Sequence, residues 1–170
     1  MKSHTFAAKL SAVAVVVCLL FLTGCDTYDN FLAEFFDKSN GQNETVKIGV
    51  FEPLTGSDAQ GAKAEIRGIE LAHELYPSVL GMPVELVYGD NQSDVSAAVT
   101  VAQNLIDKGI SISLGSYKSV LTLAASDVFK EARVPAIGIT CTNPLITKTS
   151  DYYFRVCFVD AFQGNSAAKY

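Results

Sequence analysis

The side chains best suited to covalent or metal chemistry are four cysteines and two histidines. Cys141 follows an apolar run, where catalytic residues of α/β proteins often lie, and a thiol nucleophile there needs a neighbouring base. His4 lies in an N-terminal leader and His73 lies within a helical pattern, so neither supplies that base. The sequence also lacks a G-x-G-x-x-G turn and a cluster of metal ligands. These features argue against an enzyme, a cofactor and a bound metal.

Cys141 and Cys157 are the only cysteines available to a mature fold, because Cys18 lies in the leader and Cys25 ends it. Two cysteines do not make a disulfide framework. A bridge between them stays open at this point. Two unpaired, mostly buried thiols are the favoured interpretation, since cysteine is often buried without pairing.

The N-terminal residues have the features of a lipoprotein export signal. Lys2 and Lys9 precede an uncharged run from Leu10 to Leu22, about 13 residues long. A membrane-spanning helix needs roughly 20 residues. The run ends in Leu22-Thr23-Gly24-Cys25, which resembles the bacterial lipobox, so we expect cleavage after residue 24 and lipidation of Cys25. The lipid would anchor the protein at the extracytoplasmic face of the cell membrane.

The charge balance argues against a nucleic-acid partner. The formal net charge of the chain is −5, and loss of Lys2 and Lys9 with the leader brings it to −7. An acidic body is repelled by phosphate backbones.

After a polar, turn-rich tether over residues 25–45, apolar runs of strand length alternate with helical patterns. The first helix is expected from about Ser57 or Gly61 to Tyr76, with capping-box spacing from Ser57 to Gln60. Asp94 is expected to cap the second helix and Gly109 to end it. The expected strands cover 46–51, 84–88, 110–115, 134–140 and 153–156, with further helices after residue 119 and over 163–170. This alternation predicts a Rossmann-like α/β fold, with a mostly parallel sheet and helices on both faces.

In such a fold the ligand lies beyond the carboxyl ends of the strands, near the point where the strand order reverses. The loops expected there are 52–59, 116–119 and 140–143.

Short motifs in and around these loops occur in a fixed order. They are Pro53-Leu54-Thr55-Gly56, Arg67-Gly68-Ile69-Glu70-Leu71-Ala72, Gly115-Ser116-Tyr117-Lys118-Ser119, Val134-Pro135-Ala136, Thr142-Asn143-Pro144, Phe154-Arg155-Val156 and Gln163-Gly164. Each motif is weak alone, but their order and spacing over residues 46–170 resemble the branched-chain amino-acid-binding family of type I periplasmic binding proteins. The resemblance implies a two-lobed protein whose first lobe is formed in part by residues 46–158, with a crossover to a second lobe beginning at 159–170.

The resemblance also implies which residues hold a ligand, namely Ser119, Thr140 and Thr142, with Tyr117 beside them. A carboxylate would find donors in the Ser119 hydroxyl and in the N–H groups that begin the next helix. An ammonium group would find acceptors in the Thr140 carbonyl and the Thr142 hydroxyl. The alternatives are that Ser119 is only an N-cap and Thr142 only a turn former. Lys118 is either a solvated surface charge or a group that reaches the cleft and favours an acidic ligand.

The sequence therefore predicts a substrate-binding lipoprotein that captures an amino acid, branched-chain or related, and delivers it to the permease subunits of an ABC importer. The lipobox favours transport over the alternative, a ligand-sensing receptor domain of the same fold. We also expect the chain to be an N-terminal portion of the protein that does not trap a ligand tightly by itself.

Overall fold

The computed structural model describes residues 45–170 of the chain. The leader, Cys25 and the tether up to residue 44 lie outside the described residues, so lipidation and the domain boundaries stay predictions. Within residues 45–170, no helix is both long and apolar enough to cross a membrane.

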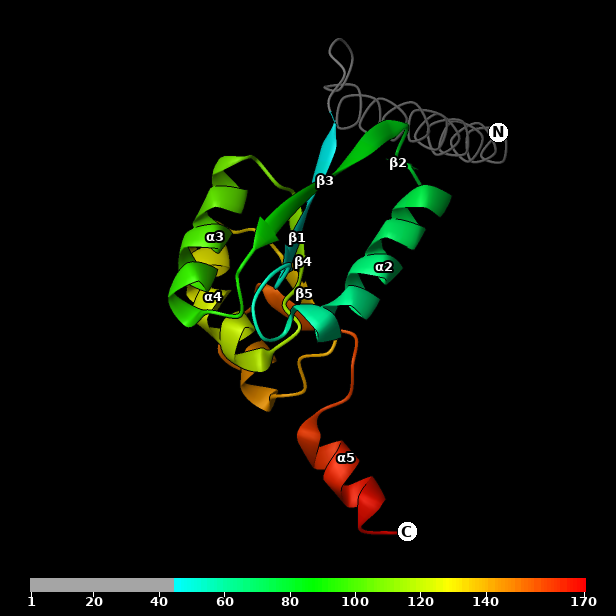
Figure 1. Cartoon of the computed structure of the whole chain (residues 1–170), viewed down its shortest axis with the longest axis vertical. Coiled ribbons are helices and arrows are strands. Elements are labelled where there is room, and N and C mark those ends of the chain that lie inside the picture. Colours follow the sequence, from blue (N-terminus) through cyan, green and yellow to red (C-terminus); the bar gives the residue numbers. More distant parts are fainter. Residues whose placement is uncertain (1–44) are drawn as a thin grey trace, which may run out of the picture. The chain divides into compact units, whose positions relative to one another are not determined.

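A six-stranded sheet organises the described residues (Figure 1). The spatial order is β2-β3-β1-β4-β5-β6, and every neighbouring pair is parallel except the antiparallel pair β2 and β3. The predicted α/β fold with a mostly parallel sheet is confirmed. The strands are β1 (Val46–Glu52), β2 (Ser78–Val79), β3 (Met82–Asp90), β4 (Ile112–Gly115), β5 (Ala136–Gly138) and β6 (Tyr153–Arg155).

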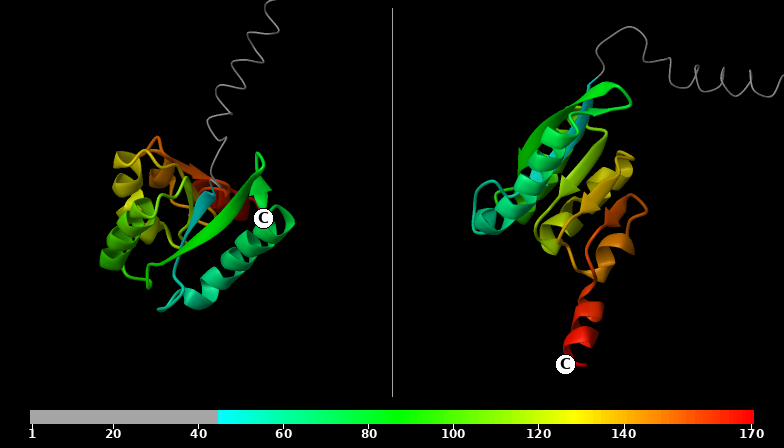
Figure 2. Two further views of the ribbon diagram at one scale, coloured as in Figure 1. Left: turned by 90° about the horizontal axis from the view of Figure 1, so that it is seen from above. Right: turned by 90° about the vertical axis from the view of Figure 1, so that its right-hand side faces the viewer.

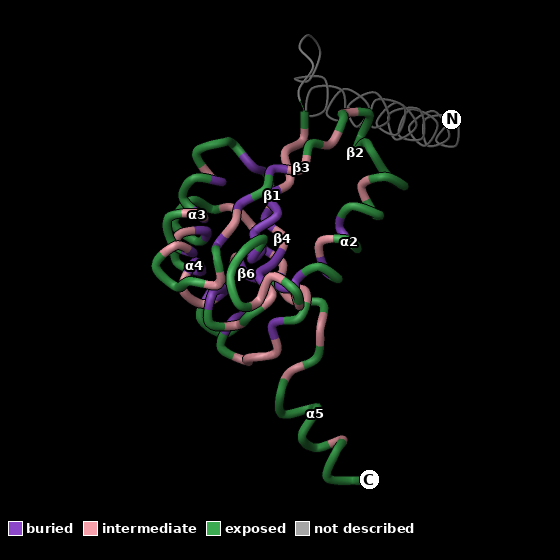
Figure 3. Tube along the Cα trace, in the orientation of Figure 1, coloured by how far each residue is buried: buried purple, intermediate pink, exposed green. Residues whose placement is uncertain are grey.

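Helices cover both faces of the sheet, as predicted. Helix α2 (Ala59–Leu75) lies against one face, and α3 (Val95–Asp107) and α4 (Ser119–Glu131) lie against the other (Figures 1 and 2). A short 3₁₀ helix, η2 (Pro144–Thr147), follows β5. The last helix, α5 (Asp160–Ala167), has no buried residue and stands apart from the sheet (Figure 3).

The main apolar core fills the space between the sheet and the helices α3 and α4. Phe129 of α4 sits at its centre, where its ring packs edge-to-face on Phe51 at 5.7 Å and on Tyr153 at 6.3 Å. Helix α3 contributes the i, i+4, i+7 stripe expected of an amphipathic helix. The buried cluster comprises Phe51, Val87, Ala98, Ala102, Leu105, Ile110, Leu121, Ala125, Phe129, Ala136, Cys141, Ile146 and Tyr153.

Helix α2 covers its face of the sheet less completely. An apolar cavity of about 220 Å³ lies between this helix and the sheet, with Ile48, Tyr76 and Val84 among its lining residues. Ile48 and Val84 belong to the first half of their strands, whereas Leu114, which also lines the cavity, is the next-to-last residue of β4.

The boundaries of helix α3 follow the predicted capping signals. Asp94 is the N-cap, and its carboxylate accepts a hydrogen bond from the Ala97 N–H at 2.8 Å. Gly109 follows the helix with φ +76°, a left-handed conformation that glycine adopts without steric cost.

The predicted capping box at the start of α2 is wrong. Asp58 is the N-cap and makes no side-chain cap, because its carboxylate forms an ion pair with Lys118 at 2.6 Å. Gln60 accepts from Lys63 and does not reach back to residue 57.

Other predicted boundaries need small corrections. β2 was not expected; it forms a hairpin with β3 around Leu80 (φ 52°) and Gly81 (φ 80°), and a leucine at positive φ is an unusual turn residue. The strands predicted over 110–115 and 134–140 are shorter, since they cover only Ile112–Gly115 and Ala136–Gly138. The last helix begins at Asp160, three residues earlier than predicted.

Candidate functional site

The strand order reverses between β1 and β4, because the chain moves from β1 to β3 on one side of the sheet and then to β4 on the other. The carboxyl ends of β1 and β4 meet there, with Phe51 opposite Gly115. Ligands of open parallel sheets bind at such a switch point. The loops that follow β1, β4 and β5 meet at this edge and form the candidate site.

The structure brings the four predicted ligand-binding residues to two neighbouring segments, the turn into α4 and the loop after β5. The Thr140 hydroxyl lies within hydrogen-bond distance of the Tyr117 carbonyl oxygen at 3.2 Å. The Asn143 N–H donates to the Ser119 hydroxyl at 3.3 Å, and Thr142 lies between these two contacts along the chain.

Ser119 has a donor available for an anion. Its hydroxyl oxygen accepts from Asn143, and no described residue accepts the hydrogen that the hydroxyl itself carries. Lys118 is the N-cap of α4, so the alternative that Ser119 is only an N-cap is wrong. The first bonds of the helix run from Leu121 and Thr122 to the Lys118 carbonyl, which leaves the N–H groups of Ser119 and Val120 facing out of the helix end.

Thr140 and Thr142 present oxygen acceptors at the same edge. Thr140 is exposed and Thr142 is half-buried. The Thr142 carbonyl accepts from the Asp160 N–H at 3.1 Å, and its hydroxyl makes no hydrogen bond with another residue of the range 45–170. That hydroxyl is therefore free to meet a ligand.

Lys118 is engaged at the rim of the site. Its ammonium group lies 2.6 Å from the Asp58 carboxylate, and half of its side chain is exposed. The pair neutralises both charges locally, which agrees with the surface-charge interpretation of Lys118. The Asp58 side chain is only 11% exposed, so the pair is partly buried.

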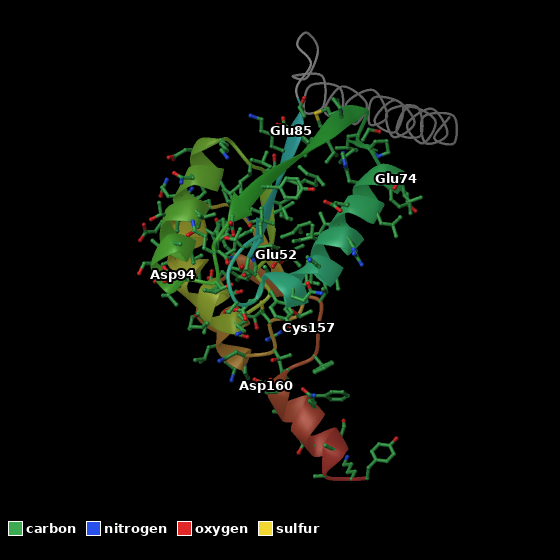
Figure 4. All side chains as sticks on the ribbon, in the orientation of Figure 1. Glu52, Glu74, Glu85, Asp94, Cys157 and Asp160 are labelled. Atoms are coloured by element: carbon green, nitrogen blue, oxygen red, sulfur yellow. The ribbon has the colours of Figure 1, made fainter. Side chains whose placement is uncertain are left out.

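Two buried carboxyl groups that the sequence analysis did not identify lie directly behind these residues. Glu52 is the last residue of β1 and is 0% exposed, and its Oε2 accepts from the Tyr117 N–H at 2.8 Å. Glu65 of α2 is 7% exposed, and its Oε1 accepts from the Thr140 hydroxyl. Figure 4 shows Glu52 in the interior, where β1 ends beside the first turns of α2. The sequence holds one signal that could have found this pair, because Glu65 is an acidic residue in the buried helical stripe that Ala62 and Ile69 also form.

Burial controls the ionisation of these two groups. Burial raises the pKa of Glu52 to about 9, and the nearby charge and hydrogen bond of Glu65 act in the same direction against the opposing Tyr117 N–H. Burial also raises the pKa of Glu65, while hydrogen bonds from Thr140 and Glu52 lower it. The two carboxyl groups therefore do not both ionise at neutral pH.

The two cysteines are free thiols, as the favoured interpretation predicted. Cys141 is buried, with its sulfur 2.6 Å from the Ser116 carbonyl oxygen and 3.0 Å from the Thr122 hydroxyl. Burial raises the pKa of Cys141 to about 12, which keeps the thiol protonated and unreactive. Residues 45–170 contain no group of three side chains suited to a metal ion.

Arg155 fixes the loop after β5. Its guanidinium donates to the carbonyl oxygens of Cys141 at 3.3 Å and Asn143 at 2.8 Å, and to the Thr147 hydroxyl at 2.9 Å. Such a multidentate contact fixes the backbone on both sides of Thr142.

Asp90 fixes the loop after β1. Its carboxylate accepts from the N–H groups of Leu54 and Thr55 at 2.9 and 3.1 Å, and from the Thr55 hydroxyl at 2.7 Å. Burial raises the pKa of Asp90, but the hydrogen bonds from Thr55, Gln92 and Leu54 outweigh it and lower the pKa overall.

Comparison with known proteins identifies the family of the described residues. A family model described as periplasmic binding protein matches residues 45–170. The chain is 33% identical over 129 residues to a Leu/Ile/Val-binding protein homolog of Brucella abortus, covering 74% of this chain and 35% of that protein.

Comparison with solved structures likewise finds binding proteins. A leucine-binding protein from Thermotoga maritima superposes with a TM-score of 0.70 and 38% identity, covering 72% of this chain and 35% of the other. A solute-binding protein of an ABC transporter from Rhodopseudomonas palustris, in complex with 3,4-dihydroxybenzoic acid, superposes with a TM-score of 0.68 and 28% identity. The match covers 75% of this chain and 37% of the other. The chain thus spans about 35% of the length of the curated relatives that it matches.

Proposed function

The chain belongs to the periplasmic binding protein family, and from this premise we propose that it forms the first-lobe side of a protein that captures an amino acid, branched-chain or related, for an ABC importer. The permease subunits of the importer are the proposed partners. Cys25, outside the described residues, is proposed to carry the lipid that anchors the protein at the extracytoplasmic face of the membrane. A family of binding proteins also agrees with the expectation that the chain is not an enzyme.

The observation that carries the proposal is the set of donors and acceptors at the β1–β4 switch point. The Ser119 hydroxyl and the N–H groups that begin α4 suit a carboxylate, and the helix dipole adds about 0.3–1 kcal/mol. The Thr140 carbonyl and the Thr142 hydroxyl suit an ammonium group. Hydrogen bonds to charged groups contribute about 1.5–3 kcal/mol each, so a few of them support micromolar affinity after ordering costs.

The names of the relatives support transport more than sensing, because one solved relative is the solute-binding protein of an ABC transporter. They leave two ligand classes to compare, an amino acid and a small aromatic acid such as dihydroxybenzoate. Both have a carboxylate, but only the amino acid has an ammonium group. The acceptors of Thr140 and Thr142 would have no cationic partner in an aromatic acid, so the described edge favours the amino acid.

Binding experiments on the two-lobed protein test the proposal. Thermal-shift screening against amino acids and hydroxybenzoates identifies the ligand class, because a ligand that binds only the native state raises stability. In calorimetric titrations we expect Ser119→Ala and Thr142→Ala each to weaken amino-acid binding by about 1–3 kcal/mol. Ser111→Ala is the matched control, because Ser111 is exposed and lies before β4. If both site variants bind as tightly as this control, Ser119 and Thr142 have only structural roles.

A further inference from the structure

The carboxyl groups of Glu52 and Glu65 are each half satisfied. Tyr117 donates to Oε2 of Glu52, and Thr140 donates to Oε1 of Glu65. The other two oxygens, Glu52 Oε1 and Glu65 Oε2, are buried and receive no donor from the described residues. Tyr117 links the two groups, because its N–H donates to Glu52 and its carbonyl oxygen lies 3.2 Å from the Thr140 hydroxyl that donates to Glu65. Each group's missing partner is therefore the other carboxyl group.

A single proton shared between Glu52 Oε1 and Glu65 Oε2 gives both oxygens a hydrogen bond. Two ionised carboxylates would face each other without a donor at low dielectric, and both would be strongly destabilised. One carboxylic acid beside one carboxylate gives a donor and an acceptor, and O–H to O⁻ hydrogen bonds are among the strongest in proteins. The proton belongs on Glu52, because Glu52 is the more buried of the two.

The titratable groups around Glu52 and Glu65 are neutral or paired, so these two carboxyl groups are the main source of charge near Thr140. From the loops after β5 and β6, Cys141 and Cys157 face the pair as neutral thiols, because burial raises both of their pKa values. Tyr153 of β6 is likewise neutral, because burial raises the pKa of its phenol. At the start of α2 and α4, the ion pair of Asp58 with Lys118 cancels its own charge.

We propose that Glu52 and Glu65 hold one proton between them and thereby fix a single negative charge behind Thr140, which makes this edge of the site select ligands that carry an ammonium group. The inference rests on the proposed function and adds to it the two residues that set the ligand's charge. Glu65 acts through Thr140, whose hydroxyl it orients while its charge adds to the potential at the Thr140 carbonyl. Glu52 acts through Glu65 and through the Tyr117 N–H. Both are positioning residues and neither touches the ligand.

The first test detects the proton without a ligand. The full chain, labelled with ¹³C at the glutamate carboxyl carbons, is titrated by NMR, and Glu52→Gln and Glu65→Gln assign the two resonances. We expect one of the two carboxyl groups to remain protonated at pH 7 in the wild-type chain. Ionised signals for both Glu52 and Glu65 at pH 7 would overturn the proposal, whatever the protein binds.

The second test measures selectivity in the two-lobed protein with L-leucine and 4-methylpentanoate, which is leucine without its ammonium group. Glu52→Gln imitates the protonated acid, since its oxygen can accept from Tyr117 and its NH₂ can donate to Glu65. The Glu52→Gln protein is therefore the reference for the next substitution. Adding Glu65→Gln removes the remaining charge and should reduce the preference for leucine over 4-methylpentanoate about tenfold.

The matched control adds Glu74→Gln to Glu52→Gln, because Glu74 is an exposed carboxylate on the same helix. An unchanged leucine preference in the Glu52→Gln/Glu65→Gln protein would refute the inference. A wild-type protein that binds neither leucine nor any other amino acid would instead refute the proposed function and the selectivity with it, while the NMR titration still decides whether the proton is shared.

Discussion

Replacing Glu52 with glutamine should change how the stability of the folded chain depends on pH. The pKa of Glu52 rises from an ordinary value of 4.5 to about 9 on folding, chiefly through burial. Between these two values the folded chain keeps a proton that the unfolded chain releases. The stabilising contribution of the protonated group is complete below pH 4.5 and is lost as pH rises towards 9.

One proton bound only in the folded state makes the unfolding free energy fall by about 1.4 kcal/mol per pH unit. From pH 6 to pH 8 the loss is about 2.7 kcal/mol, a large part of the 5–15 kcal/mol by which domains are typically stable. Asp90 and Cys141 titrate outside this window, since the pKa of Asp90 is lowered from 3.8 and that of Cys141 is raised from 9.0. The Glu52→Gln chain has no such proton, so its stability should be nearly constant between pH 6 and 8.

Denaturant unfolding of residues 25–170, followed by circular dichroism at half-unit steps of pH, measures this slope. In thermal unfolding of the same chains, the wild-type melting temperature should fall by roughly 5–11 °C between pH 6 and 8, and that of Glu52→Gln should change little. Glu85→Gln is the control, because Glu85 is exposed on the neighbouring strand β3 and should keep the wild-type slope. Parallel curves for wild-type and Glu52→Gln chains would show that Glu52 is already ionised in the folded state.

Three further predictions concern the anchor, the open site and a helix cap. Cys25→Ala should leave an unprocessed or mislocalised precursor, and mass spectrometry of the membrane fraction should find a diacylglyceryl group on wild-type Cys25; normal anchoring of the variant would rule out lipidation there. Residues 25–170 alone should bind L-leucine no more tightly than about 1 mM, because Thr140 is exposed and its contacts stay in high dielectric; micromolar binding to a monomer in calorimetry would contradict this. Asp94→Ala should lower the unfolding free energy by about 0.5–2 kcal/mol, since the Ala97 N–H loses its acceptor; an unchanged denaturation midpoint would show that the cap contributes nothing.

Local patterns were enough to predict the sheet and its helices. The apolar stripe of α3, its cap at Asp94 and its end at Gly109 all lie within 16 residues, so neighbouring side chains determine them. The start of α2 could not be predicted in this way. Asp58 is a good N-cap residue by type, but its carboxylate is held by Lys118, which lies 60 residues later in the chain. A long-range ion pair of this kind leaves no signal in local spacing.

The ligand edge was predictable only in part, for the same reason. Ser119, Thr140 and Thr142 follow predicted strands, so topology alone brings them to one edge of the sheet. Glu52 and Glu65 do not share this position after a strand. Glu52 ends an apolar strand, and Glu65 interrupts an apolar helical stripe. Taken singly, each of them conflicts with the pattern of a buried core. Their pairing, and the link from Glu65 to Thr140, appear only after folding has joined positions 52, 65 and 140.

That conflict is itself informative about function. A leucine at position 52 or 65 would satisfy the apolar pattern and avoid the cost of burying a carboxyl group, so stability does not explain these residues. The carboxyl pair lies at the switch point, and its two accepted hydrogen bonds come from the loops that carry the predicted ligand-binding residues. Residues that break the local apolar pattern are expected where a fold gives up stability for binding. A charge enclosed behind Thr140 also interacts with a ligand through protein instead of water, where electrostatic interactions are stronger. Water is excluded from Glu52 and Glu65, which makes the pair costly to bury. The same exclusion strengthens the attraction between the charge of the pair and the ammonium group of a ligand.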